Sequence, residues 1–334
     1  MEKICTTELC TRFESCSKER LNSRRETGPG LGGSGLGVVS VWATPAAPKT
    51  NRTASEAENG FIHSYNRRLK VAGLALLIAF AATPARSQDN YEIQVYGSET
   101  VAPQTTMVEL HSNFTFSGSK TVIDGMYPTE HALHETLEIT HGFTPWFETG
   151  FYVFTSAKDQ YGWQWVGDHI RPRVRVPEDW KWPVGVSLSL EFGYQRAVYS
   201  PDTWTLEIRP IIDKQIRRWY LAFNPTLDRS FHGPSVPMGL VFSPNFKVGY
   251  DITPKINAGF EYYGSLGPIY QFDPLREQQQ QIVPCIDLNL SPAWEFNFGV
   301  GVGVTRGTDH LLVKMIIGRR FGGAAPKPAT AGTP

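Results

Sequence analysis

The sequence predicts an all-β protein, a transmembrane antiparallel up-and-down β-barrel of about twelve strands. The first observation behind this prediction is that apolar and polar residues alternate along many segments of about ten residues, a length at which a tilted strand crosses a bilayer. The second is that short turns and longer loops follow one another between these segments. The third is that Trp and Tyr lie near the segment ends, where the bilayer surface would be.

The composition argues against several other classes of protein. Lys and Arg together number 32 and Asp and Glu also number 32, so the formal net charge is zero and no nucleic-acid partner is expected. Apolar residues make up 41% of the chain and charged residues 19%, which argues against intrinsic disorder. The four cysteines have spacings that match no zinc pattern, and neither a metal nor a cofactor is expected.

Residues 67–87 have the pattern of a cleaved secretory signal peptide. Basic residues within 67–70 precede an apolar run over 71–82, and small residues form a cleavage site that ends at Ser87. The apolar run is short, because a helix that spans a bilayer needs about 20 such residues. We therefore expect cleavage after Ser87, and the alternative is a buried helix of a soluble domain.

The rest of the chain divides around this signal peptide. Residues 1–66 are rich in Gly, Ser, Thr and charge without a strand or helix period, and we interpret them as a disordered extension or a misplaced start. Residues 88–105 are expected to be a periplasmic N-terminal segment and residues 106–321 the barrel. Residues 322–334 are expected to be a flexible periplasmic tail.

The barrel strands are predicted from alternation, because successive side chains of a strand point to opposite faces. The predicted strands are 106–117, 131–141, 146–156, 165–176, 184–196, 203–213, 217–225, 238–251, 255–264, 281–290, 293–305 and 310–321. The predicted short turns are 143–145, 213–215, 253–254 and 291–292. The predicted longer loops are 118–130, 226–237 and 265–280.

The last predicted strand carries the most specific signal. Leu311, Val313 and Met315 share one face, Lys314 lies on the other, and the aromatic Phe321 closes the strand. An aromatic residue at this place resembles the C-terminal signal by which bacterial outer-membrane barrels are recognised for insertion.

Taken together, these features resemble bacterial outer-membrane β-barrels, and most closely the family of outer-membrane proteins associated with a phenol-degradation pathway. The resemblance covers roughly residues 106–321 and rests on HETLEITHGFTPWFETGFYVF (134–154), WEFNFGVGVG (294–303) and IIGRRF (316–321). It implies location in the bacterial outer membrane, with outer-membrane lipids and the barrel-insertion machinery as partners. Members of this family are often described as transporters.

A secreted β-sandwich is the alternative architecture, because its strands alternate as well. The exposed faces of a soluble sandwich should carry abundant Lys and Glu, whereas the polar faces here are rich in Gly, Ser, Asn and Thr. Aromatic residues near strand ends form candidate interfacial girdles, and they are Trp146, Trp204, Trp219, Tyr250, Tyr262 and Trp294. These observations favour the barrel.

Two stretches depart from the alternation. Glu135 falls on the apolar face of its strand, which would be costly at mid-depth, so either the register slips or this strand contacts another subunit. Trp163 and Trp165 are out of phase with Ile170, which predicts a β-bulge near Gly167.

Charged side chains on the polar faces are the candidate pore-lining residues. They are Arg171, Arg173, Arg175, Glu191, Glu207, Arg209, Lys247, Glu261, Glu295 and Lys314. They could line a small water-filled path, or pair with one another in a structural lattice, and both interpretations stay open. Lys314 is expected to lie between Glu295 on the preceding strand and Glu109 on the first strand.

Three arginines at alternate positions of one strand, Arg171, Arg173 and Arg175, should form a stripe along the lumen. Such a stripe favours anions and can stack on aromatic rings, unless a carboxylate such as Glu191 on the next strand neutralises it.

Neither a metal site nor a catalytic site is predicted. His134 and Glu138 share a face, with His111 within reach on the neighbouring strand, but a structural or pore-lining role is favoured over metal binding. His111 and Ser112 are adjacent on a strand and point to opposite faces, so they cannot form the dyad of a hydrolase.

The predicted function is therefore passive passage of small organic solutes, anionic or aromatic ones among them, through an outer-membrane barrel. An occluded barrel that only anchors or interacts is the alternative, and an outer-membrane hydrolase is less favoured. The protein is not expected to be an enzyme.

Overall fold

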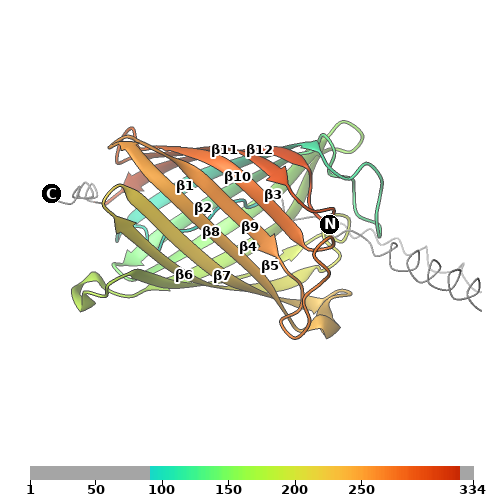
Figure 1. Ribbon diagram of the computed structural model, residues 1–334, viewed down its shortest axis with the longest axis horizontal. Coiled ribbons are helices and arrows are strands. Elements are labelled where there is room, and N and C mark those ends of the chain that lie inside the picture. Colours follow the sequence, from blue (N-terminus) through green and yellow to red (C-terminus); the bar gives the residue numbers. More distant parts are fainter. Residues whose placement is uncertain (1–90, 324–334) are drawn as a thin grey trace, which may run out of the picture. The chain divides into compact units, whose positions relative to one another are not determined.

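The computed structural model describes residues 91–323, so the signal peptide, the segment before it and most of the C-terminal tail lie outside the described residues. Twelve antiparallel strands form one closed barrel, in which sequence neighbours pair and β1 pairs with β12 (Figure 1). This confirms the predicted all-β, up-and-down architecture. Within residues 91–323, no helix is long and apolar enough to cross a membrane.

The strands agree closely with those predicted from alternation. They are β1 (Thr105–Ser117), β2 (Leu133–Thr144), β3 (Phe147–Lys158), β4 (Gly162–Arg175), β5 (Gly185–Gln195), β6 (Trp204–Ile216), β7 (Trp219–His232), β8 (Leu240–Thr253), β9 (Ile256–Ser265), β10 (Gln279–Leu288), β11 (Trp294–Gly303) and β12 (Leu311–Gly322). The largest difference is in β7, which continues beyond Pro225 to His232 because Leu227 still pairs with Ile208 of β6.

The connections define two rims. The turn rim carries 145–146, 176–184, 217–218, 254–255 and 289–293. The loop rim carries 118–132, 159–161, 196–203, 233–239, 266–278 and 304–310. The turn predicted at 213–215 lies instead at 217–218, because Lys214 and Gln215 still pair with β7 and Arg217 supplies the turn with a positive φ of 53°.

The two faces of the wall have opposite chemistry. The outward side chains are apolar and exposed, as Leu137, Phe192 and Phe298 illustrate, at 40%, 41% and 46% exposure. The inward side chains include most of the buried charged and polar residues of the described chain. An apolar surface of this extent on a folded barrel has the character of a lipid-facing surface.

Both departures noted in the sequence have a structural explanation. The pairing of β3 with β4 shifts at Phe154 and leaves Val166 as an extra residue beside Gly167, which confirms the predicted bulge. At Glu135 the register does not slip, because Glu135 lies opposite Ser112 in continuous pairing. The Ser112 hydroxyl donates to this carboxylate at 2.8 Å, close to the loop rim.

Proline interrupts the wall between β6 and β7. The ladder pairs Ile208 with Leu227 and next pairs Ile212 with Phe223, so Pro210 and Pro225 lie opposite each other in the intervening gap. Neither proline has an N–H to donate. On the other side, Pro225 pairs with Pro244 of β8 in an uninterrupted ladder.

Candidate functional site

The barrel interior is filled by the chain that precedes β1. Residues 91–101, hereafter the luminal segment, run from the loop rim to the turn rim. Near the loop rim, the Tyr91 carbonyl accepts hydrogen bonds from Asn113 and Thr136 at 3.3 and 2.7 Å. Near the turn rim, the Val101 N–H donates to Glu148. These residues therefore lie inside the barrel, whereas the sequence predicted a periplasmic location for residues 88–105.

The luminal segment has an apolar side that packs against the inner wall. Ile93 and Val95 are 1% and 6% exposed and pack with Tyr263, Val283 and Leu312. Burying one such aliphatic side chain is worth about 1.5–3 kcal/mol. The inward faces of these strands thus provide a hydrophobic core as well as charged groups.

Polar side chains of the wall hold the backbone of the segment. Lys314 donates to the Ile93 carbonyl at 2.9 Å, and Arg173 donates to the carbonyls of Gly97 and Glu99. Asp213 accepts the Ser98 N–H and hydroxyl at 3.1 and 2.6 Å. Nearly every buried backbone polar group of a protein needs such a partner, and here wall side chains provide many of them.

Glycine permits the close approach of the segment to the wall at the turn rim. A Cβ on Gly142 of β2 would lie 2.2 Å from the Val101 carbonyl oxygen and 2.4 Å from that of Ala102. These distances are far below van der Waals contact, and the opposing atoms belong to the backbone. Gly142 is therefore needed where the segment leaves the lumen.

The arginine stripe contacts the luminal segment directly. The guanidinium groups of Arg171, Arg173 and Arg209 lie 4.8, 5.6 and 4.8 Å from the centre of the Tyr96 ring. These distances are within the range of cation–π attraction. Arg175 lies apart from this cluster, near the turn rim, where it pairs with Glu178 at 3.1 Å.

Nine of the ten predicted pore-lining residues take part in ion pairs, and the tenth, Glu191, contacts the imidazole of His169. The contacts are Arg171 with Glu138 (2.6 Å), Arg173 with Glu148 (2.7 Å), Arg175 with Glu178 (3.1 Å), Glu191 with His169 (2.6 Å), Glu207 with Arg209 (2.6 Å), Lys247 with Glu261 (3.1 Å), Glu295 with Arg320 (2.8 Å) and Lys314 with Glu261. The expected position of Lys314 between Glu295 and Glu109 is wrong. Glu109 and Glu295 both lie opposite Gly318, further along β12. The Lys314 ammonium reaches Glu261 of β9 instead.

Three buried groups lie close enough together to be considered as metal ligands. One atom each of Glu109, His111 and Glu138 lies within 4.8 Å of the others. However, Arg171 binds Glu138 at 2.6 Å, so a cation already occupies this carboxylate. His134, the third residue considered in the sequence, lies in a pocket at the loop rim.

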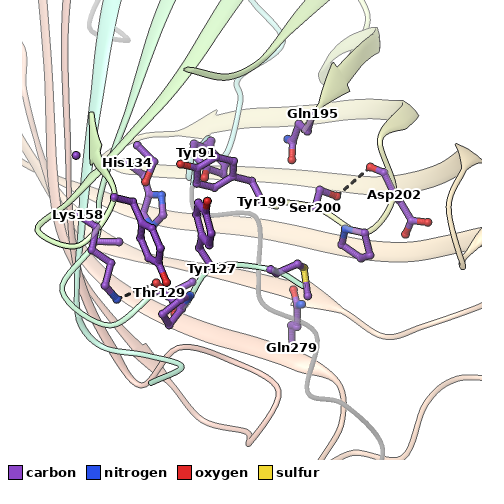
Figure 2. A pocket seen from close by; sticks show the side chains of 17 residues that line it. Tyr91, Tyr127, Thr129, His134, Lys158, Gln195, Tyr199, Ser200, Asp202 and Gln279 are labelled. Carbon is purple, nitrogen blue, oxygen red and sulfur yellow. Dashed lines mark hydrogen bonds between the residues drawn. The ribbon is translucent and has the colours of Figure 1, made fainter. Parts of the chain in front are cut away.

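That pocket, hereafter the loop-rim pocket, has a volume of about 170 Å³. It lies where the luminal segment meets the β1–β2 and β5–β6 loops, with walls that include Tyr91, Tyr127, His134 and Tyr199 (Figure 2). The rings of Tyr91 and His134 meet edge to face at 4.8 Å. Burial raises the pKa of the loop residue Tyr199, so this phenol stays protonated at neutral pH.

The hydrolase interpretation finds no support in the geometry of its candidate pair. His111 is buried inside the barrel, whereas the Ser112 hydroxyl is bound to Glu135 across the β1–β2 ladder. The two side chains therefore lie on opposite faces of β1, as the alternation predicts.

Sequence reasoning missed the luminal segment and with it the role of Asp213 and Glu148. A signal was present, because apolar Ile93 and Val95 alternate with polar Glu92 and Gln94. Such alternation shows that a segment has two different faces, but it does not tell whether the segment joins the wall or lies within it.

No family model matches the chain, and no curated protein matches its sequence. Membership in the phenol-degradation-associated family therefore stays a prediction. Similar solved structures include the NanC porin, with a TM-score of 0.43 and 12% identity over 64% of this chain and 99% of that one. The KdgM porin in complex with disordered oligogalacturonate gives 0.40 and 10% over 65% and 99%. Outer membrane phospholipase A from Escherichia coli gives 0.41 and 9% over 70% and 94%. Likeness at this level identifies no function.

Proposed function

We propose that the protein is an outer-membrane channel for small organic solutes, and that the luminal segment closes it in the conformation described here. The observation that carries the proposal is an apolar outer wall around a polar interior whose central occupant is a separate extended segment, outside the strand ladders. Removing that occupant would leave a passage through the barrel without breaking the wall.

The charge balance of the interior favours uncharged solutes over anions. Arg171 and Arg173 are bound to Glu138 and Glu148, and both guanidiniums also lie near Tyr96. A cation stripe that is neutralised in this way provides little attraction for an anion. We therefore expect the solutes to be uncharged, in contrast to the anionic solutes that the arginine stripe suggested.

The test is single-channel conductance in planar bilayers with the segment locked in place. Ser98 and Asp213 touch, so cysteines at both positions, with the native cysteines replaced by Ser, should form a disulfide between segment and wall. We expect openings in the reduced protein and their loss on oxidation. The single variants Ser98→Cys and Asp213→Cys control for loss of the hydrogen bond.

Two outcomes would contradict the proposal. Conductance that is the same in the reduced and oxidised double variant would show that solutes do not need the segment to move. A folded barrel that never conducts, even when residues 91–99 are deleted, would favour the occluded structural barrel, the alternative function. The observation that supports this alternative is that nine of the ten predicted pore-lining residues are ion-paired and the tenth, Glu191, contacts His169.

A further inference from the structure

We propose that the loop-rim pocket binds an uncharged molecule with a single aromatic ring and one hydrogen-bonding group such as a hydroxyl. We further propose that such molecules are the solutes of the channel, a step that rests on the proposed function. The pocket itself does not depend on that step, because its chemistry follows from the residues that line it.

The walls of the pocket suit a flat ring. Tyr127 stacks on Tyr161 with ring centres 3.8 Å apart and an angle of 9°, and Tyr199 meets Tyr127 edge to face at 5.4 Å. Tyr91 lies edge to face with Tyr199 at 6.4 Å. Aromatic rings attract one another in these stacked and edge-to-face arrangements, so an aromatic ligand finds both kinds of partner here.

The size of the pocket limits the ligand to one ring. Its volume is about 170 Å³. An engineered apolar cavity of about 150 Å³ in another protein binds benzene. The loop-rim pocket therefore has room for one six-membered ring with a small substituent.

His134 provides the hydrogen-bonding partner. Its side chain is buried, with 4% of the residue exposed, and neither ring nitrogen has a hydrogen-bond partner among the described residues. Buried polar groups are nearly always paired. A ligand hydroxyl could donate to the unprotonated nitrogen of the imidazole or accept from the protonated one, and would satisfy this group.

The hydrogen-bonding atoms of the charged pocket residues already have partners, which disfavours a charged ligand. The Lys158 ammonium donates to the Pro128 carbonyl at 2.9 Å and to that of Glu130. The Asp202 carboxylate accepts from the Ser230 hydroxyl and the Ser235 N–H, both at 3.0 Å. A carboxylate ligand would have to compete with these backbone carbonyls for its cation.

Tyr91 connects the pocket to the closure of the channel. Its ring forms part of the pocket wall, and its carbonyl is held by Asn113 and Thr136 of the barrel. A ligand in the pocket thus contacts the N-terminal end of the luminal segment. This is the place at which an incoming solute would first meet the segment.

The experiment is ligand-observed NMR on the full-length protein in detergent micelles, with three matched probes. Benzyl alcohol has the ring and the hydroxyl, ethylbenzene replaces the hydroxyl by a methyl group, and benzoate carries a charge. We expect saturable binding of benzyl alcohol and at least fivefold weaker binding of the other two probes. Ethylbenzene leaves His134 unpaired, and benzoate brings an uncompensated charge into the pocket.

Three variants of the pocket sharpen the test. Ala132→Phe fills the pocket and should abolish specific binding of all three probes. Any probe signal that remains with this variant measures partitioning of the probe into the detergent micelles. Ser156→Leu fills it from β3 and replaces Ala132→Phe if that variant does not fold. His134→Phe should reduce the preference for benzyl alcohol over ethylbenzene to less than twofold. His141→Phe, on the same strand at the turn rim, should leave the preference unchanged.

The pocket assignment is overturned if ethylbenzene or benzoate binds as tightly as benzyl alcohol, or if the filled variant binds like the wild type. Measuring single-channel conductance as well as binding distinguishes failure of the pocket assignment from failure of the proposed channel function. Specific binding in a barrel that never conducts supports the pocket and overturns its role in uptake. Conductance without binding of benzyl alcohol overturns the pocket and leaves the channel.

Discussion

Asn224 binds Tyr96 as a neighbouring strand would. The Tyr96 N–H donates to Asn224 Oδ1 at 2.9 Å, and Asn224 Nδ2 donates to the Tyr96 carbonyl at 3.0 Å. A primary amide carries both a donor and an acceptor, so one side chain satisfies both backbone groups of the opposing residue. The centre of the luminal segment is thereby fixed to β7 without joining the sheet.

Asn224→Ala should loosen the luminal segment. It removes two hydrogen bonds worth about 0.5–1.5 kcal/mol each, which together correspond to about 5- to 150-fold in the opening equilibrium. Hydrogen exchange of residues 91–101 should accelerate accordingly. Asn245→Ala is the control, because Asn245 lies directly opposite Asn224 in the β7–β8 ladder. Equal exchange in Asn224→Ala and the wild type would contradict the role of this pair.

Arg173→Gln should destabilise the whole barrel. It removes the closest cation, at 2.7 Å, from the fully buried Glu148 and leaves this carboxylate with Arg171 at 3.5 Å and the Val101 N–H. Complete loss of a buried pair costs about 3–5 kcal/mol, so we expect a destabilisation that approaches this range. The free energy of unfolding in denaturant measures the effect. Adding Glu148→Gln should recover much of the loss, and a double variant no more stable than Arg173→Gln would argue against direct coupling.

Arg175→Gln provides the matched comparison for this prediction. Its partner Glu178 is 78% exposed, and exposed pairs contribute about 0–1 kcal/mol. We therefore expect nearly unchanged stability in this variant.

The β1–β2 loop should loosen in acid. Burial alone would raise the pKa of Glu130, but hydrogen bonds from the Gly118 N–H and Lys120 lower it below its ordinary value. The contacts of the ionised form therefore stabilise the loop at neutral pH, and this contribution is lost as pH falls from the ordinary carboxyl range through the lowered pKa of Glu130. Limited proteolysis within 118–132 should show this change. Glu130→Gln should be susceptible already at pH 7, and protection that persists in this variant would contradict the prediction.

Pro225→Val should strengthen the interrupted seam between β6 and β7. It restores an N–H at a position opposite Pro210, where the ladder has a gap. Deuterium uptake in β6 and β7 should fall. Pro244→Val serves as the control, because the β7–β8 ladder continues through Pro244 without a gap. Uptake that is the same in all three proteins would show that proline does not cause the gap.

The sequence was sufficient for the wall of the barrel because period-two alternation is a local property. It placed the strands, the outward aromatic residues and the bulge beside Gly167, and it assigned the inward and outward faces of β12. Partner choice in the interior was less accessible. Lys314 of β12 pairs with Glu261 of β9, a strand that is not its neighbour. The position of each residue in its own strand does not indicate that the two side chains meet.

The interior itself could not be predicted for a related reason. A barrel of this size can hold water, side chains or a further segment, and the inward faces have polar residues in each case. Ile93 and Val95 pack against Tyr263 and Leu312, which are far from them in the sequence, so local patterns do not reveal these contacts. The loop-rim pocket depends in the same way on three loops and the luminal segment coming together.

The direction in which the luminal segment runs limits how it can leave the barrel. The segment is joined to β1 at the turn rim through residues 102–104, so it can be withdrawn there without unpairing any strand. On withdrawal at the turn rim, any residue joined to the N-terminal side of Tyr91 would have to pass through the whole length of the barrel. A short chain ahead of Tyr91 would make the segment a removable stopper, whereas a long one would keep the barrel threaded.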